Sequence, residues 1–504
     1  MFVVLARAAG VITATRVGDD DTVLGSEVVP DLAQFVASEE AAGPRWVWND
    51  TRSWYPELLA ERVRVERCFD LRLCHAILRN STVTAGSALA TAPAGPWDAP
   101  PAVERAAPTG TLFDLDDEHE PVAEAVPFAE FQAQRDAAAT SAEPGRIGRL
   151  LAAESAGALI GVEMQFAGLP WRTATHDEIL TELLGPRPRD GERPEKLQVL
   201  LERVRDLFEA PQLNPDSPTE LLSALQNAGL QATSTRSWEL RELTHPGIPP
   251  LLEYKKLARL LSANGWHWLD TWVAGERFRP DYVPGGVVTG RWATSGGGAL
   301  QLPKQIRGAV VADPGCKLVV ADAAQLEPRI LAALSGDHEM VRAGAAGDLY
   351  AGIVASGAVK TREQAKVGML GAMYGATTGE SGRLLPGLAR AYPRAIGLVE
   401  EAARTGERGD VVTTRLGRSS PPGAGQAYNE AASAAETARA RNRARAWGRF
   451  TRNFIVQGTA AEWALCWMAS VRRRLRQVGG DLWLTDAPHL VFFLHDEIVV
   501  HCRA

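Results

Sequence analysis

Cysteine is scarce in this chain, and the few cysteines show no pattern. Five occur in 504 residues, at positions 68, 74, 316, 466 and 502, and no two of them form a Cys-x-x-Cys pair. This spacing excludes a disulfide framework and a zinc site built on paired cysteines. Scattered thiols are typical of proteins in a reducing compartment, so we expect a cytoplasmic protein.

Long apolar stretches are also lacking. No run of about 18 apolar residues predicts a membrane-spanning helix. The first residues, Met-Phe-Val-Val-Leu-Ala-Arg, lack the basic lead-in and the cleavage site of a secretion signal, and they predict a β-strand instead. We therefore expect no membrane partner. A length of 504 residues allows two to four domains with cores of their own.

Positive charge is in deficit overall, but its distribution is uneven. The net charge is −7, and residues 81–130 hold nine acids and one arginine, a net of −8, which leaves about +1 (−7 + 8) for the remainder. Residues 437–453 contain six arginines and no acid. Local patches rather than totals set the field that a ligand meets. The arginine run is therefore either a solvated helix face or a surface for a polyanion such as DNA.

An acidic segment divides the chain near its first quarter. Residues 84–127 are rich in Ala, Pro, Gly, Asp and Glu and show no periodicity, which predicts a disordered acidic linker. It separates a small domain, residues 1–83, from the rest. Two strand-like segments and a turn near Gly10 predict that this domain begins with a hairpin of strands over 2–6 and 11–17. Helices are expected near 31–38 and 70–79.

Two aspartates follow strand-like apolar runs. Asp322 comes directly after residues 317–321, and Asp496 comes shortly after residues 490–494. Burying an ionised carboxylate costs several kcal/mol unless something compensates the charge. A divalent metal is the usual compensation, and two aspartates that share two metal ions suit in-line phosphoryl transfer. Solvent-facing aspartates at strand ends would give the same pattern, so the pair alone leaves both interpretations open.

Four residues between these aspartates step by four along the chain. Arg362, Lys366, Leu370 and Tyr374 would run down one side of a helix with a drift of about 40° per step. The two cations suit phosphates, and the leucine and tyrosine suit a sugar and a base. Glycines at 368, 371 and 375 weaken a helix but let a flat partner approach its backbone. A solvated Arg/Lys edge is the alternative, and the glycines count against it.

These segments, in this order, resemble the A-family DNA polymerases, the group of bacterial DNA polymerase I. The resemblance covers about residues 150–504 and rests on six motifs. The two palm motifs resemble Asp322 with Gln325-Leu326-Glu327 and His495-Asp496-Glu497, and the fingers helix resembles Arg362-x3-Lys366-x3-Leu370-Gly371-x2-Tyr374-Gly375. The template-primer segment resembles Thr289-Gly290-Arg291 with Leu300-Gln301-x-Pro303, the minor-groove helix resembles Arg449-x3-Asn453-x3-Gln457-Gly458-Thr459-Ala460-Ala461, and the thumb helix resembles residues 252–257. Together these motifs are specific, although no single one would be.

The resemblance implies a fold and its division into parts. The fold would be α+β, a right-hand polymerase with palm, fingers and thumb, preceded by a small α/β ribonuclease-H-like domain. The implied ranges are a polymerase domain over 128–504, with the thumb at about 213–275, the palm at about 280–345 and 450–504, and the fingers at about 346–449. Residues 1–83 would be a degenerate exonuclease-like domain, because its first strands carry no paired carboxylates to hold metals. We therefore expect no proofreading.

The resemblance also implies roles for individual residues. The catalytic and metal-binding residues would be Asp322, the carbonyl of Ala323 and Asp496, which hold two Mg²⁺ ions (with Mn²⁺ as the alternative), Glu497, which supports them, and Lys366, which protonates the leaving pyrophosphate. The nucleotide-binding residues would be Arg362, Lys366, Gln325, Leu370, Tyr374 at the templating position, and Glu327, which blocks a 2′-hydroxyl. The DNA-binding residues would be Arg291, Gln301, Arg449, Asn453, Gln457 and His495.

Several positions depart from the family pattern. Leu370 stands where an aromatic residue is usual, so we expect weaker stacking on the sugar of the nucleotide. Tyr350 replaces a usual histidine near the triphosphate. Only seven residues follow Glu497, whereas the family continues with a helix and a strand that back the palm. We therefore expect either a fragment or an unusually open palm.

The sequence thus predicts a DNA-directed DNA polymerase that works in DNA repair or replication. Its partners would be primer-template DNA and deoxynucleoside triphosphates, and it would act as a monomer near the bacterial nucleoid. Two alternatives stay open. A single-subunit RNA-synthesising relative is disfavoured by Glu327, and a catalytically silent DNA-binding protein is disfavoured by the intact aspartates and triphosphate-binding cations.

Overall fold

The chain forms two compact units. The computed structural model describes residues 1–99, 126–189, 191–345, 347–376, 379–423 and 434–504. The first unit consists of Met1–Phe166, Tyr282–Ala293 and Val319–Val500, and the second of Ala167–Asp281, Thr294–Leu318 and His501–Ala504. Each predicted domain boundary has to be compared with this division.

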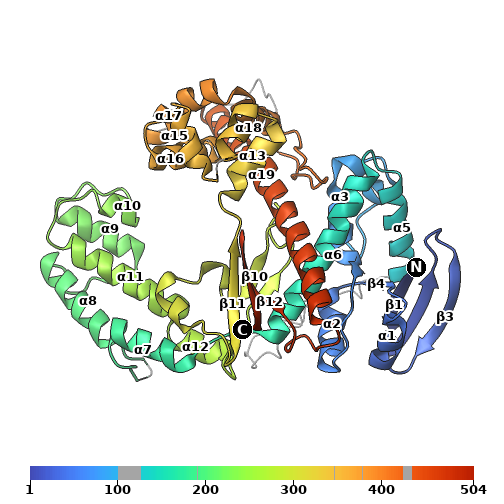
Figure 1. The fold of residues 1–504 in the computed structure, drawn as a ribbon. Helices are drawn as coiled ribbons and strands as arrows, with labels where there is room; N and C mark the ends of the chain where they lie inside the picture. Colours follow the sequence, from blue (N-terminus) through green and yellow to red (C-terminus); the bar gives the residue numbers. More distant parts are fainter. Residues whose placement is uncertain (100–125, 190, 346, 377–378, 424–433) are drawn as a thin grey trace. The chain divides into compact units, whose positions relative to one another are not determined.

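The first unit begins with a five-stranded mixed sheet and its helices (Figure 1). These elements are β1 (Phe2–Ala8), β2 (Val11–Val17), β3 (Val23–Val29), α1 (Leu32–Glu40), β4 (Arg45–Trp48), α2 (Thr51–Ala60), β5 (Cys68–Asp70) and α3 (Leu71–Asn80). The strand order is β3-β2-β1-β4-β5. β1 pairs antiparallel with β2 and parallel with β4. The predicted hairpin, the two predicted helices and the α/β architecture are confirmed.

Both faces of this sheet are covered, which explains why β1 reads as a continuous apolar run. Side chains alternate along a strand, so Val3 and Leu5 enter one core while Val4 enters the other. The long helix α6 (Pro144–Ala167) contributes to both cores, through Leu159 on one side and Leu150 on the other. Each such buried side chain stabilises the fold by about 1.5–3 kcal/mol.

The predicted linker over 84–127 begins too early, because residues near its predicted start are helical, whereas its predicted end lies within one residue of the next helix. The short helices η1 (Thr82–Thr84) and α4 (Ala88–Thr91) lie inside or beside its start, and α5 (Pro127–Ala139) begins at its end. The guanidinium of Arg79 donates hydrogen bonds to the carbonyls of Leu89, Ala90 and Ala92. One arginine and the buried Leu89 therefore fix a segment whose composition alone predicts disorder. Residues 100–125 lie outside the described residues.

One helix has the length and composition of a membrane span, contrary to the expectation from the sequence. That helix is α6, and 78% of its apolar window is buried inside the protein. The core helix of a soluble fold passes the same test, so the observation is weak evidence for a membrane partner.

A helical region of the first unit carries the four-residue steps. Its helices are α13 (Leu326–Ser335), α14 (His338–Ala345), α15 (Leu349–Ala355), α16 (Arg362–Tyr374), α17 (Gly379–Ala391), α18 (Pro393–Glu407) and α19 (Ala434–Gly479). The long helix α19 runs without a break across residues 449 and 450, so the predicted fingers–palm boundary falls inside one helix (Figure 1).

Helix α16 confirms the predicted spacing but corrects the interpretation of its glycines. It begins after Thr361, whose hydroxyl accepts from the Gln364 N–H at 3.1 Å, and it ends at Gly375 with φ of 74°. Gly368 and Gly371 are buried against α17, and a Cβ added to Gly371 would lie 2.5 Å from the Cβ of Ser381. These two glycines therefore admit a neighbouring helix rather than a flat ligand.

Three strands form the sheet that carries the aspartates. They are β11 (Cys316–Asp322), β12 (His489–Leu494) and β13 (Glu497–Arg503), in the order β11-β13-β12. His495 and Asp496 make the two-residue turn between β12 and β13, and His495 takes the left-handed conformation, with φ of 56°, that such turns favour. The strands predicted before Asp322 and Asp496 are confirmed.

The second unit is mainly helical and has a core of its own. Its helices are α7 (Thr173–Leu184), α8 (Glu195–Leu207), α9 (Pro218–Asn227), α10 (Ser237–Leu240), α11 (Ile248–Asn264) and α12 (Trp266–Trp272), with the 3₁₀ turns η2 (Ala299–Gln301) and η3 (Lys304–Ala309). Its short strands are β6 (Leu169–Pro170), β7 (Val273–Ala274) and β8 (Arg277–Phe278), whereas β9 (Asp281–Val283) and β10 (Ala293–Gly296) contain the points where the chain passes from one unit to the other. The thumb bounds of 213–275 stay a prediction, since α7 and α8 precede them in the same unit.

Candidate active site

The two predicted metal-binding aspartates lie next to each other. The N–H of Ala323 donates to the carbonyl of Asp496 at 2.8 Å, which joins the end of β11 to the β12–β13 turn. Asp322 is exposed at the end of its strand. Burial, followed by the negative charge of Asp322, raises the pKa of the Asp496 carboxyl above its usual value. Two like charges in this position favour a bound cation.

Aromatic residues hold the β12–β13 hairpin from behind. The hydroxyl of Tyr282 donates to the carbonyl of Phe493 at 2.8 Å and accepts from its N–H at 3.1 Å. The ring of Trp292 packs edge-on against both, with centroid distances of 5.3 Å to Tyr282 and 5.0 Å to Phe493. The sequence did not identify these residues, because an aromatic side chain near a motif does not show what it contacts.

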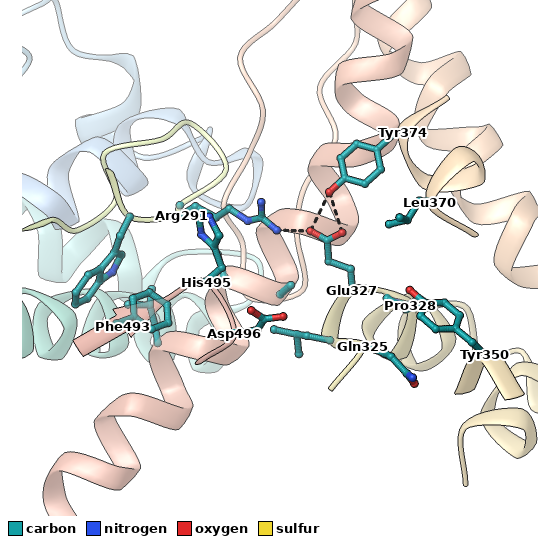
Figure 2. A pocket seen from close by; sticks show the side chains of 16 residues that line it. Arg291, Gln325, Glu327, Pro328, Tyr350, Leu370, Tyr374, Phe493, His495 and Asp496 are labelled. Carbon is teal, nitrogen blue, oxygen red and sulfur yellow. Dashed lines mark hydrogen bonds and ion pairs between the residues drawn. The ribbon is translucent and has the colours of Figure 1, made fainter. Parts of the chain in front are cut away.

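A cavity of about 280 Å³ opens beside Asp496 (Figure 2). Its lining includes Arg291, Gln325, Glu327, Tyr350, Leu370, Tyr374, His495 and Asp496. Glu327 accepts a hydrogen bond from the Tyr374 hydroxyl at 3.0 Å and forms an ion pair with Arg291. Burial and the Glu327 charge raise the pKa of Tyr374, so the phenol stays protonated and donates. Residues predicted from four separate motifs, the template-primer segment, the fingers helix and the two palm motifs, thus line one cavity.

Asp348 organises the side of the cavity formed by α15. Its carboxylate caps α15, accepts from the Gln325 amide at 2.7 Å and accepts from the Arg362 guanidinium at 2.7 Å. The hydrogen bond from Arg362 is the main cause that lowers the pKa of Asp348 to about 2. Arg362 also lies 5.5 Å above the ring of Tyr350. The sequence motifs give Asp348 no role at this site, although Asp before Leu-Tyr is a helix-capping signal.

The remaining residues of the fingers helix lie where the predicted spacing puts them. Lys366 and Tyr374 are exposed, Leu370 is half-buried, and the opposite side of α16 is buried. Leu370 and Tyr350 both line the cavity, so α15 supplies an aromatic ring to it although α16 has a leucine at position 370. Arg362 and Lys366 are not part of the lining of the cavity.

Helix α19 brings three of the predicted DNA-binding residues to the end of α16. The side chain of Gln457 hydrogen-bonds to Tyr374. Arg449 is exposed and passes Gly375, where an added Cβ would lie 2.8 Å from the Cγ of Arg449. The side-chain oxygen of Asn453 is buried and has no hydrogen-bond partner in the part of the chain that the structure describes.

Three other predicted residues occupy different places. His495 lines the cavity, and burial together with the charge of Arg291 lowers its pKa, which favours the neutral ring. Glu497 is the first residue of β13. Gln301 belongs to the second unit, where it lines a hollow of about 1280 Å³ together with Lys255, Lys256 and Arg259. The structure therefore does not place Gln301 in the cavity.

The donor set at the aspartate pair suits Mg²⁺. No cluster of three or more His, Cys, Asp or Glu side chains suited to a metal occurs among the residues that are described. The available ligands are the carboxylates of Asp322 and Asp496 and the carbonyl of Ala323. Mg²⁺ is usually held by one or two carboxylates, water and substrate phosphates, so two carboxylates and a carbonyl fit this ion.

Comparisons with known proteins agree with this geometry. The DNA polymerase I of Chloroflexus aurantiacus is 27% identical over 309 residues, which cover 55% of this chain and 30% of that protein. The thermostable DNA polymerase I of Thermus filiformis is 28% identical over 332 residues, which cover 60% of this chain and 36% of that protein. The chain thus spans about a third of the length of these relatives.

A solved structure matches the fold over the full chain. It is the polymerase domain of Pol1 from M. smegmatis in complex with DNA primer-template and dNTP, with a TM-score of 0.68 and 18% identity, covering 100% of this chain and 89% of that one. This likeness confirms the predicted right-hand polymerase fold. The family model for DNA polymerase family A matches residues 190–504. Because that match spans more than half of the chain, the protein belongs to DNA polymerase family A.

Proposed function

We propose that this protein is a DNA-directed DNA polymerase that adds deoxynucleotides to a primer 3′-hydroxyl by two-metal phosphoryl transfer. The observation that carries the proposal is the position of Asp322 and Asp496, which are joined through the Ala323–Asp496 hydrogen bond at the edge of the cavity around Glu327. We assign the protein to DNA repair or replication in the bacterial cytoplasm, as a monomer.

The aspartate pair would hold the metal ions between the primer and the nucleotide. Asp322, Asp496 and the Ala323 carbonyl are the proposed ligands, and Glu497 is the proposed support. Bound Mg²⁺ would lower the pKa of the primer hydroxyl and neutralise charge on the triphosphate. Phosphoryl transfer requires mainly positioning and charge neutralisation, and a pair of carboxylates at the end of two rigid strands supplies both.

Residues of α16 would bind the nucleotide. Arg362 and Lys366 are proposed to neutralise the triphosphate, with Lys366 as the proton donor to the leaving pyrophosphate. Before a triphosphate binds, Arg362 is held by Asp348, so this ion pair must open or be shared. Tyr374 is proposed to stack at the templating position once it leaves Glu327.

Glu327 would exclude ribonucleotides. It lies in the cavity with its carboxylate fixed by Tyr374 and Arg291, and this position suits a group that occupies the space of a 2′-hydroxyl. Leu370 offers no ring to the sugar, and Tyr350 on α15 presents one to the same cavity. We therefore propose deoxynucleotides as the substrates.

The N-terminal domain is proposed to lack proofreading activity. β1 and β2 carry no carboxylate. Asp50 and Asp70, which follow β4 and end β5, have structural roles, because Asp50 caps α2 and the buried Asp70 caps α3 and accepts from Thr51. We expect no shortening of a labelled primer when nucleotides are omitted, measured with Mg²⁺ and again with Mn²⁺.

Primer extension on a recessed-end DNA template tests the proposed function. The wild-type protein with Mg²⁺ should add the deoxynucleotide that each templating base specifies, and it should add ribonucleotides far more slowly. Preferred use of ribonucleotides would favour the RNA-synthesising alternative. Tight DNA binding without any nucleotide addition would favour the catalytically silent alternative.

A further inference from the structure

A stripe of polar residues runs along α19 and leads to the cavity. Arg441, Arg445, Arg449, Asn453 and Gln457 follow one another at intervals of four, about 6 Å apart along the helix, and the stripe turns around the helix by about 40° at each step. No acid occurs between Glu436 and Glu462, so the helix carries positive charge over this length. The stripe therefore changes from cationic at its start to neutral and hydrogen-bonding at its end.

The three arginines of the stripe differ from those that serve the fold. Arg441, Arg445 and Arg449 are exposed and form no ion pair within the described part of the chain. By contrast, Arg452 is buried, where it pairs with Glu400 and donates to the carbonyl of Ala372 at 2.8 Å. The stripe arginines thus contribute charge to the surface without contributing to the packing of α19.

An ordinary solvated helix face in this protein has a different composition. On α14, the exposed Arg342 pairs with Glu339 one turn before it, and on α18, Arg404 pairs with Glu401. Such i,i+3 pairs are the usual arrangement on a surface that only water contacts. At the start of α19 only Arg439 has an acid at such a spacing, Glu436, whereas Arg441, Arg443 and Arg445 have none, and this composition favours a polyanionic partner.

The stripe is continuous with the cavity and passes the end of α16. Gln457 hydrogen-bonds to Tyr374, and the chain of Arg449 lies against Gly375, the residue after Tyr374. Residues 460 and 461, one turn beyond Gln457, line the cavity itself. Moving from the cavity toward the start of α19, the order is therefore cavity, Tyr374, Arg449 and then the two outer arginines.

We propose that Arg441 and Arg445 bind phosphates of the unpaired template strand before it reaches Tyr374. This inference rests on the proposed function, in which Tyr374 marks the templating position. When a template base lies at Tyr374, the template bases that are already paired with the primer lie on the cavity side. The part of the template that has not yet been copied therefore extends to the other side, past Gly375. Arginine side chains spaced by about 6 Å along a rigid helix can follow the phosphates of that strand.

The test compares two primer-template DNAs that share one duplex and differ only in template overhang, one nucleotide against about ten. Binding is measured by fluorescence anisotropy of the labelled duplex for the wild type and for the R441Q/R445Q variant. The wild type should bind the long overhang more tightly, and the variant should lose this advantage. Two phosphate contacts on a single strand imply that the advantage falls about seven-fold between about 50 and 200 mM salt.

The matched control is R439Q/R443Q, which removes the same charge from the same turns of α19 but on the side of the helix about 160° away. It should keep the overhang advantage. The proposal is overturned if R441Q/R445Q keeps the full advantage, if the control loses as much, or if R441Q/R445Q weakens both DNAs equally, which would indicate duplex binding. Circular dichroism and thermal melting establish that each variant is folded.

Failure of this inference is distinguishable from failure of the proposed function. Nucleotide addition by the wild-type protein on the short overhang reports on polymerase activity alone. If the wild-type protein extends this primer while the R441Q/R445Q variant keeps its overhang advantage, the proposed function stands and the inference about Arg441 and Arg445 is wrong. If the wild-type protein extends no primer but its overhang advantage depends on Arg441 and Arg445, the proposed polymerase activity is wrong and the strand-binding surface stands.

Discussion

At the scale of single residues, Glu327 shows what a motif can and cannot predict. The motif Gln325-Leu326-Glu327 identified the glutamate, but nothing in its spacing indicated that Tyr374 and Arg291 both donate to its carboxylate. The three residues are far apart in the sequence, and only the folded chain brings them into one cavity. The same is true of Asp348, which contacts Gln325 and Arg362.

Substituting Glu327 by alanine should reduce sugar discrimination. The change opens the space that a ribose 2′-hydroxyl needs, so we expect the ratio of kcat/KM for dATP over ATP to fall at least about ten-fold, or about 1.4 kcal/mol. Steady-state single-nucleotide addition measures this ratio. Glu339→Gln, on the exposed face of α14, is the control and should leave it unchanged. An unaltered ratio in Glu327→Ala would remove Glu327 from sugar selection.

Asp348→Asn should strengthen nucleotide binding. Asparagine still caps α15 but no longer forms an ion pair with Arg362, so the guanidinium becomes available to a triphosphate. Both partners are exposed, and exposed ion pairs contribute little because water screens them, so the Kd for the nucleotide should fall by at most about five-fold. Pre-steady-state addition at varied dNTP concentration gives this Kd. A weaker affinity would mean that Asp348 positions Arg362 instead of restraining it.

At the scale of elements, periodicity predicted most of what lies near each motif. The strand-like segments and the turn in 2–17 predicted the β1–β2 hairpin, and the steps of four predicted α16 with its accessible side. Contacts between distant elements could not be predicted, because the sequence pattern of α16 does not show that α17 packs on its glycines. The start of the linker was wrong for the same reason, since Arg79 fixes a segment that lies well beyond it in the chain.

The buried carboxylate of Glu163 joins three elements. It accepts from Arg472 on α19 at 2.7 Å, from Arg64 after α2 at 2.8 Å, and from the Tyr55 hydroxyl at 2.7 Å. Burial alone would raise the pKa of Glu163, but the two arginines bring it below its usual value. The stability that this lowered pKa confers is present above the pKa of an unfolded glutamate, about 4.3, and is lost as pH falls toward the folded value.

Glu163→Gln should therefore destabilise the first unit strongly. It leaves Arg472 buried without a counter-charge, and breaking one partner of a buried pair costs about 3–5 kcal/mol. Urea unfolding at pH 7 measures the loss. The exposed Glu61→Gln serves as the control, and Glu163→Gln combined with Arg472→Met should recover part of the stability. A loss below about 1 kcal/mol would contradict the structural role assigned to Glu163.

At the scale of the whole molecule, the N-terminal domain is part of the same compact unit as the candidate active site. The composition of 84–127 predicted an independent domain, but α6 shares cores with the N-terminal sheet, and Glu163 on α6 pairs with Arg472 on α19. The N-terminal region therefore stabilises the helix that carries Asn453 and Gln457. The sequence could not show this, because the composition of a segment indicates whether it tends to be ordered and does not indicate which residues it contacts.

His75 gives this N-terminal region a pH dependence. Burial would lower its pKa, but the hydrogen bond and charge of Glu130, at 2.7 Å, together with those of Asp98, raise the pKa above the usual value. A raised folded pKa stabilises the protein below the unfolded pKa of about 6.5, and the gain is lost as pH rises through the folded value. The urea midpoint should accordingly fall from pH 6 to pH 8 by more in the wild type than in His75→Gln. Equal changes would contradict the assignment.

The most direct test of the account is single-turnover addition of one deoxynucleotide by Asp322→Asn and Asp496→Asn beside the wild type, with Mg²⁺. Each asparagine keeps the shape of the side chain but removes a charge from the proposed metal site. The account predicts that both variants bind primer-template DNA as the wild type does and add the nucleotide at least about 100-fold more slowly. Addition at the wild-type rate by either variant would contradict it.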